Sequence, residues 1–265
     1  MRKVIISVAP VSGANKNPAP GPIAADVTAC RAAGAAMVHL HARDLQGRLT
    51  EDVTNLSDTL DAIRAGSDIV IQASTGGVSG LNIRQRCMPL TLDKVETASL
   101  NVGSVNLEQL VYQNPIEDVK HCVRELLATR ILPEIEVFEL GMIHTVMELD
   151  KELHLQQPIL INLVLGHQGA MPATSQALHA MYDFLPKGVL WGVTHFGRTD
   201  GAIFREALDM GASLVRIGFE DSNHLENGET AETNAPLVAY LAKMIRGAGC
   251  EPATPAETRA LLHTR

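Results

Sequence analysis

The stretch Ala35-Ala36-Met37-Val38-His39-Leu40-His41 is a short apolar run that ends in two histidines, and the polar segment Leu45-Gln46-Gly47-Arg48 follows it closely. An apolar run of this length before a polar segment predicts a buried strand that enters a loop. Side chains two positions apart on a strand point to the same face, so we expect the imidazoles of His39 and His41 to lie side by side.

Apolar, β-branched runs of this kind alternate with helical patterns along the whole chain, as in repeated βα units around a parallel sheet. We expect eight strands, at 3–8, 36–41, 68–73, 98–102, 132–138, 159–165, 189–194 and 213–219. We expect helices at 23–33, 53–64, 116–128, 141–152, 174–184, 200–210 and 233–248, with a short irregular one at 91–96. Eight βα units predict an α/β fold, a (β/α)8 TIM barrel, with a doubly wound sheet as the alternative.

The length and composition favour one domain. The chain has 265 residues, of which 46% are hydrophobic and 20% are charged, and this suits a single large core. We therefore expect one barrel over residues 1–265. The tail carries Thr254-Pro255-Ala256-Glu257, which predicts the cap and first turn of a short C-terminal helical extension.

Charge and cysteine usage exclude several classes of function. The net charge of −8 argues against a nucleic-acid or anionic-membrane surface, since both need clustered lysine and arginine. No run of about 20 apolar residues predicts a membrane span. The four cysteines have no C-x-x-C spacing, which suits reduced thiols and a cytoplasmic protein.

Strand ends carry the candidate metal ligands. Barrel enzymes place their active sites at the carboxyl ends of the strands, where His39 and His41 would lie. Two imidazoles form half of a zinc site, and Glu220, at the end of the eighth strand, is the natural third ligand. The alternatives are two unrelated polar histidines in the barrel interior, and a helix-capping role for Glu220.

Other reactive groups follow the same strands. Arg216 could hold Asp221 in its ionised form as a base, or the two could form a plain ion pair in the core. Gly76-Gly77 offers backbone N–H groups to an oxyanion or carboxylate, although most such pairs are simple turns. The loops at 166–172 and 196–198 lie where barrels often bind phosphate, with loop flexibility as the alternative.

Taken together, these segments resemble the β-keto acid cleavage enzymes, a family that includes 3-keto-5-aminohexanoate cleavage enzyme. The resemblance covers nearly the whole chain. It rests on seven segments in order, namely 38–43, 72–77, 99–106, 133–142, 164–166, 197–198 and 215–221.

The resemblance implies a function and a site. Family members are (β/α)8 barrels, usually homotetramers, that bind zinc and convert a β-keto acid and acetyl-CoA into acetoacetate and the CoA ester of the shortened acid. The matching metal ligands here are His39, His41 and Glu220. The resemblance further implies that Asp221 is a base supported by Arg216 and Glu136. It also implies that the substrate's oxygens are bound by Ser74, Gly77 and Ser99.

Two positions depart from the amino-acid-cleaving member of that family. Asn15 replaces a glutamate that contacts the substrate's ammonium group, and Ser99 replaces a threonine of its substrate pocket. Both changes concern the choice of substrate and leave the reaction class as it is. A zinc-dependent hydrolase of the amidohydrolase kind is the competing enzyme class, but it places His-x-His on the first strand of the barrel.

Overall fold

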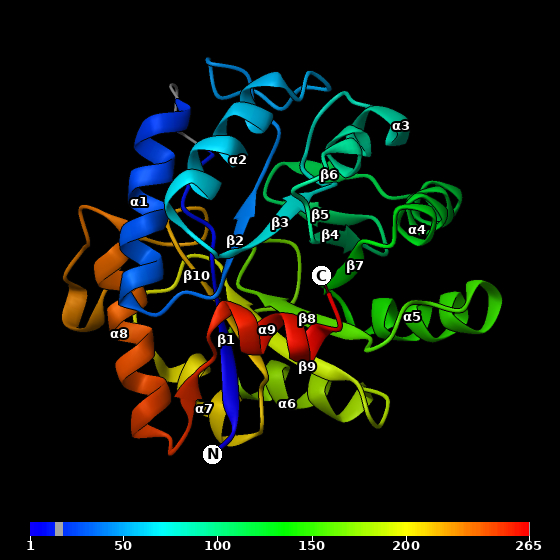
Figure 1. Ribbon diagram of the computed structural model, residues 1–265. Helices are drawn as coiled ribbons and strands as arrows, with labels where there is room; N and C mark the ends of the chain where they lie inside the picture. Colours follow the sequence, from blue (N-terminus) through cyan, green and yellow to red (C-terminus); the bar gives the residue numbers. More distant parts are fainter. Residues whose placement is uncertain (14–17, 265) are drawn as a thin grey trace.

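A computed structural model describes residues 1–13 and 18–264 (Figure 1). Eight parallel strands pair in the order β1, β2, β3, β4, β7, β8, β9, β10, and the pairing of β10 with β1 closes them into a barrel. The (β/α)8 prediction is therefore confirmed. The strands are β1 Lys3–Val8, β2 Met37–Leu40, β3 Val70–Ser74, β4 Thr97–Asn101, β7 Leu132–Val137, β8 Leu160–Leu165, β9 Leu190–His195 and β10 Leu214–Ile217.

Helices lie around the outside of the barrel, as expected for βα units (Figure 1). They are α1 Pro20–Ala33, α2 Thr54–Gly66, α4 Ile116–Thr129, α5 Leu140–Leu153, α6 Ser175–Phe184, α7 Ala202–Asp209 and α8 Asn234–Gly247. Gly34 and Gly211, which precede β2 and β10, both adopt positive φ, which lets the chain reverse after a helix. No helix of the described part is long and apolar enough to cross a membrane.

The segment between β3 and β7 differs from the expectation. In place of a helix at 91–96, the chain forms α3 Ile83–Arg86 and the 3₁₀ helix η1 Met88–Thr91. A capping box between Asn82 and Gln85 starts α3 at that point. A hairpin of β5 Val105–Leu107 and β6 Leu110–Tyr112 follows β4, and its strands are too short to leave a periodic signal.

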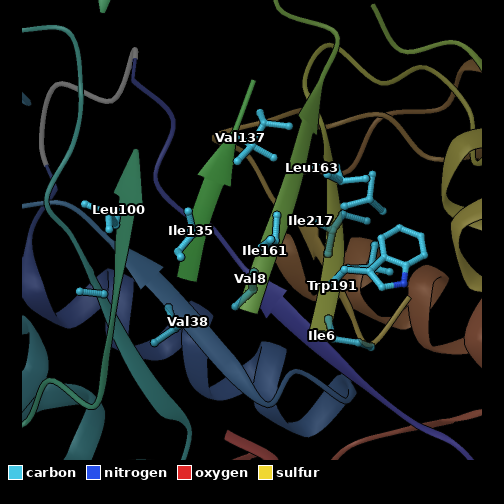
Figure 2. Close-up of a cluster of buried hydrophobic side chains, with 14 of the residues drawn as sticks. Ile6, Val8, Val38, Leu100, Ile135, Val137, Ile161, Leu163, Trp191 and Ile217 are labelled. Atoms are coloured by element: carbon cyan, nitrogen blue, oxygen red, sulfur yellow. The ribbon is translucent and has the colours of Figure 1, made fainter. Parts of the chain in front are cut away.

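The outer face of the barrel is apolar. Ile6, Val8, Val38, Ile161 and Leu163 are fully buried and belong to the large cluster that packs the strands against the helices (Figure 2). Because side chains alternate along a strand, the residues between them face the barrel interior. This sheet-to-helix layer forms most of the hydrophobic core.

The barrel interior changes character along its length. Near the amino ends of the strands it is apolar, with Ile5, Met37, Val70, Leu132, Leu160 and Leu214 in one cluster. From the middle to the carboxyl ends it is polar and still buried, with Ser7, His39, Gln72, Ser99, Glu134, Glu136, Asn162, Thr194 and Arg216. Buried polar side chains need partners, so this half of the barrel is where a hydrogen-bonded site forms.

The C-terminal extension covers the apolar end. The helix α9 Pro255–Leu262 lies across the barrel near the start of β1 (Figure 1), and Leu262 belongs to the same apolar cluster as Ile5 and Leu132. The short strand β11 Glu251–Pro252 pairs with the start of β1. This C-terminal segment closes the end of the barrel opposite the polar side chains.

Candidate active site

Two imidazoles and a carboxylate meet at the carboxyl end of the barrel. His39 lies on β2, His41 directly follows that strand, and Glu220 lies in the turn after β10. Their donor atoms all lie within 4.8 Å of one another. Because β2 and β10 both pair with β1, barrel closure brings residues 39 and 220 together.

A glycine directs Glu220 toward this point. Gly218 has φ +147°, and a Cβ added to it would overlap the backbone of Ala9 at the end of β1. The close approach lets the Glu220 N–H donate to the Ala9 carbonyl at 3.1 Å. A residue with a side chain at 218 would therefore push the turn away from β1.

A chain of hydrogen bonds fixes the tautomer of His39. The Gln72 amide nitrogen donates to Glu134 Oε2 at 2.7 Å, which leaves Gln72 Oε1 facing His39 Nδ1 at 2.6 Å. An amide oxygen only accepts, so His39 Nδ1 carries the proton and Nε2 presents a lone pair. Burial also lowers the pKa of His39 to about 3, so the ring is neutral, as a metal ligand must be.

The spacing of the three side chains fits a tetrahedral metal ion. His39 Nε2 lies 3.2 Å from His41 Nε2, and Glu220 Oε1 lies 3.3 Å from His41 Nε2 and 3.7 Å from His39 Nε2. Zinc–ligand distances of about 2.0–2.1 Å at tetrahedral angles put neighbouring ligand atoms about 3.3 Å apart. His39, His41 and Glu220 can thus hold one divalent ion with little movement.

Arg216 joins this group to two further carboxylates. Its guanidinium donates to both oxygens of Asp221, at 3.0 and 2.6 Å, to Glu136 Oε1 at 2.9 Å and to Glu220 Oε1 at 3.1 Å. Burial lowers the pKa of Arg216, but Asp221 and Glu220 outweigh that effect and hold the pKa well above its usual value. Arg216 is a permanent cation among three carboxylates.

The carboxylates differ in their affinity for protons. Burial raises the pKa of Glu220, but the neighbouring His41 and Arg216 outweigh it and keep the pKa well below its usual range. Burial raises the pKa of Glu136 to about 7 against the opposing charge of Arg216. Burial also raises the pKa of Asp221, and Arg216 offsets this only in part. Arg216 thus holds Asp221 in place without lowering its pKa below the ordinary value.

A second group of polar atoms lies at the ends of β3 and β4. The hydroxyls of Ser74 and Ser99 are 3.3 Å apart, and the Gly76 N–H donates to Ser74 Oγ at 3.1 Å. Gly77 follows with φ +127°. Ser74 and Gly76 line a small pocket together with His41, so the two groups face a common space.

The described residues expected at the site therefore come together in these two groups. Asn15 lies outside the described residues. The polar residues Gln72, Glu134 and Asn162, which position the others, carried no expected role. The alternation of side chains along each strand could have indicated that they face the same interior as the site residues. Gln72 precedes Ser74 by two positions, and Glu134 precedes Glu136 by two.

Polar side chains in the loops after β8 and β9 are buried against aromatic rings of the protein itself. Arg198 is 1% exposed, and its guanidinium lies 5.5 Å from the Phe204 ring centre and 5.7 Å from that of Tyr240. His167 stacks on Phe196 with ring centres 3.9 Å apart, and burial lowers the pKa of His167 to about 4. Arg198 is accordingly packed against aromatic rings in place of facing a phosphate.

A (β/α)8 barrel with a possible metal-ligand set and a buried ion pair of Arg216 and Asp221 at its strand ends has the arrangement of a barrel enzyme. Comparison with known proteins narrows that class. The family model described as "beta-keto acid cleavage enzyme" matches residues 3–263. The chain belongs to the beta-keto acid cleavage enzyme family.

Similar proteins include the "3-keto-5-aminohexanoate cleavage enzyme" of Fusobacterium nucleatum subsp. nucleatum. It is 34% identical over 91% of this chain and 88% of that protein. The "3-oxoadipate:acetyl-CoA acetyltransferase" of Cupriavidus necator is 34% identical over 87% of this chain and 81% of that protein. The similarity in both cases spans most of each protein.

Solved structures with this fold include one titled "Apo structure of ObcA". It has a TM-score of 0.80 at 18% identity, and the match covers 93% of this chain. This chain spans 65% of the length of that protein. At this level of identity the likeness shows a shared barrel fold.

Proposed function

We propose that this protein converts a β-keto acid and acetyl-CoA into acetoacetate and the CoA ester of the shortened acid, in a zinc-dependent reaction. The observation that carries the proposal is the meeting of His39, His41 and Glu220 beside the ion pair of Arg216 and Asp221. Family membership supports it, as does the acetyl-CoA in the name of the Cupriavidus necator relative.

The charge of the site supports a divalent cation. Arg216 contacts three carboxylates, Glu136, Glu220 and Asp221, and a single guanidinium cannot neutralise them all. Buried charges are costly unless they are paired. Zinc held by His39, His41 and Glu220 would balance them and would supply a Lewis acid for negative charge on the substrate's oxygens.

Asp221 is the proposed base. Its carboxylate removes a proton from C2 of the β-keto acid, between the keto and carboxyl groups. Both of its oxygens accept from Arg216, which fixes the direction of the carboxylate. Glu136 holds the guanidinium from the other side, at 2.9 Å, and so keeps Arg216 aligned with the base. A base held in this way needs little reorganisation when it accepts the proton.

Ser74, Ser99 and Gly77 are the proposed contacts for the substrate's carboxylate and keto oxygens. The two hydroxyls offer donors 3.3 Å apart, and they lie beside the pocket that His41 also lines. Placing the oxygens there and C2 near Asp221 sets the acid in one orientation. Holding two substrates in the reactive orientation contributes a large part of the rate enhancement that an enzyme gives to a two-substrate reaction.

The carbon–carbon steps need no nucleophilic side chain. The C2 carbanion attacks the acetyl carbonyl of acetyl-CoA, and the CoA thiolate leaves. The thiolate then adds to the former keto carbon of the acid, the bond between that carbon and C2 breaks, and C2 takes back a proton from Asp221. The products are the CoA ester of the shortened acid and acetoacetate, whose carboxyl and C2 come from the original keto acid.

A panel of β-keto acids, incubated with acetyl-CoA and assayed for acetoacetate, tests the proposal. We expect at least one acid to give acetoacetate only when acetyl-CoA is present. With carbon-labelled acetyl groups, the label should appear in acetoacetate and not in the new CoA ester. Hydrolysis of substrates without CoA, or label in the CoA ester, would reject the proposed reaction in favour of a hydrolase or another route.

The assembly and location of the protein stay predictions. The family resemblance implies a homotetramer, and light scattering on the purified protein measures the mass directly. A measured mass of 28.5 kDa, which is that of one chain, would contradict the homotetramer. We also predict a cytoplasmic location, which fractionation of the source cells can check.

A further inference from the structure

Tyr112 reaches the site from the hairpin that follows β4. It is the last residue of β6 and pairs with Val105. Leu110 and Val111 of the same strand are 60% and 49% exposed, whereas Tyr112 is 4% exposed. The hairpin therefore lies on the surface and sends this one aromatic side chain of β6 inward.

Two neighbours hold the phenol ring in place. The ring of Phe138 meets it edge to face, with centres 6.3 Å apart and planes at 87°. The guanidinium of Arg86 lies 5.5 Å from the centre of the ring, and Arg86 Nε donates to the Thr75 carbonyl at 2.8 Å. The same arginine thus fixes both the tyrosine ring and the loop that carries Ser74 to Gly77.

The Tyr112 hydroxyl lies against the backbone of Gly76. A Cβ built on Gly76 would overlap that oxygen, and it would lie 3.1 Å from the ring carbon Cζ and 3.7 Å from Ser74 Oγ. The hydroxyl therefore lies beside Gly76, the same residue whose N–H donates to Ser74 Oγ at 3.1 Å. Gly76 also lines the small pocket that contains His41.

The charges divide the site into two sides. Glu136, Glu220 and Asp221 surround Arg216 on one side. On the other side are the neutral hydroxyls of Ser74 and Ser99 and the phenol of Tyr112, with the Arg86 guanidinium on the tyrosine ring. The carboxylate of a keto acid is repelled by other carboxylates and is stabilised by neutral donors, so it is better placed on the second side.

We propose that the Tyr112 hydroxyl donates a hydrogen bond to the carboxylate of the bound β-keto acid, and that Tyr112 is therefore a substrate-binding residue. This inference rests on the proposed function. It adds a donor from an element that follows β4, so the hairpin becomes part of the binding site.

The protonation of the phenol agrees with a donor role. Burial raises the pKa of Tyr112 to about 12, although the charge of Arg86 opposes it, and Glu136 adds a smaller raising effect, so the hydroxyl keeps its proton at neutral pH. A hydrogen bond from the Gly77 N–H counteracts this shift. That N–H occupies an acceptor position on the oxygen and leaves the hydroxyl proton for the substrate.

The test compares Tyr112→Phe with Tyr182→Phe in the zinc-loaded enzyme. Both changes remove one hydroxyl and keep the ring, but Tyr182 lies on α6 and packs against Trp191. Calorimetric binding of acetoacetate, itself a β-keto acid, is the first measurement. Loss of a hydrogen bond to a charged group predicts about 10- to 100-fold weaker binding for Tyr112→Phe, with no change for Tyr182→Phe.

Methyl acetoacetate separates a carboxylate contact from a packing effect. It keeps the keto group and lacks the negative charge, so Tyr112→Phe should bind it as wild type does. In turnover assays the same variant should raise KM for the keto acid more than it lowers kcat. Equal losses for acetoacetate and its methyl ester would assign Tyr112 a packing role and overturn the inference.

Gly76→Ala supplies a second, independent variant. Its Cβ must displace the tyrosine hydroxyl, so acetoacetate binding should weaken in the wild-type background and change much less in the Tyr112→Phe background. Additive losses would overturn the inference. The two hypotheses can be rejected separately. A wild type that makes no acetoacetate rejects the proposed function. An active wild type whose acetoacetate binding equals that of Tyr112→Phe rejects only the role of Tyr112.

Discussion

The orientation of His39 illustrates how much of the site depends on side chains beyond the ligands themselves. Its Nδ1–H donates to Gln72, and Gln72 in turn donates to Glu134. Glu134 also accepts from Asn162 at 2.5 Å. Three strands thus contribute to the direction of one imidazole lone pair, which is the usual way that outer partners orient a metal-binding histidine.

At the scale of single residues, we predict that His41→Ala loses the metal. The wild type should contain one zinc per chain by elemental analysis, because two imidazoles and Glu220 leave one position for substrate or water. His179→Ala is the matched control, since His179 lies on α6 and pairs with Glu206 on the surface. Full zinc content and activity in His41→Ala would show that the ligands are misassigned.

Asp221→Asn should keep the fold and the zinc but lose turnover. An amide of the same shape cannot accept the C2 proton, and loss of a general base typically lowers the rate by about 10²- to 10⁴-fold. Steady-state kcat, with zinc content and melting temperature as checks, measures this. Asp183→Asn on the exposed face of α6 is the control. A near-normal rate would remove Asp221 as the base.

Asn15→Glu should shift the choice of substrate toward an amine. A neutral amide has no charge to pair with an ammonium group, so we predict that the wild type prefers a keto acid with a neutral, hydroxylated or anionic tail. Because buried charge pairs are worth a few kcal/mol, the ratio of kcat/KM values should change by orders of magnitude.

The ratio for 3-oxo-5-aminohexanoate and an uncharged analogue measures this preference. Asn17→Glu, which adds the same charge two positions away, is the control for a general effect of charge. A wild type that already favours the amine is incompatible with the prediction.

At the scale of elements, α9 depends on its capping box. The Glu257 N–H donates to Thr254 Oγ1 at 3.2 Å, and the Thr254 N–H donates to Glu257 Oε2 at 2.9 Å. The helix also carries Arg259, which donates to Glu96 Oε2 at 2.6 Å. These contacts keep Leu262 packed against the apolar end of the barrel.

Thr254→Ala should therefore lower the free energy of unfolding by about 1 kcal/mol, the usual cost of losing a cap. Thr233→Ala is a close control, because Thr233 is also an N-cap residue but makes no side-chain capping hydrogen bond to α8. Chemical denaturation of both variants measures the difference. Equal losses would mean that the Thr254 hydroxyl contributes nothing specific to α9.

At the scale of the whole molecule, the proposed metal joins the two strands that flank β1. His39 and His41 belong to the β2 side, and Glu220 belongs to the β10 side. An ion bound only to the folded state stabilises it by about 2.7 kcal/mol when its concentration is 100 times Kd. For a chain of this size that is about 5–10 °C in melting temperature.

Removal of zinc with a chelator should thus lower the melting temperature by several degrees, and added zinc should restore it. His41→Ala should melt at the same temperature with and without the chelator. Identical melting of the wild type in zinc and in chelator would argue against a structural link through this site.

The sequence by itself determined the order of elements and the face that each strand residue occupies. Apolar runs alternating with helical patterns predicted the eight barrel strands, and these signals are local, since they depend only on side chains a few positions apart. The same alternation placed His39 and His41 on one face. The prediction was wrong only for short segments, because α3 and the β5–β6 hairpin are too short to show a hydrophobic period.

Only the tertiary structure decided which strand ends meet. Glu220 reaches His39 because β10 pairs with β1 across more than 200 positions of sequence, and Gly218 allows the close contact with Ala9. The partners of Gln72 and the place of the Tyr112 hydroxyl likewise depend on contacts between strands and loops. Such contacts follow from barrel closure and side-chain packing, and local periodicity contains no information about either.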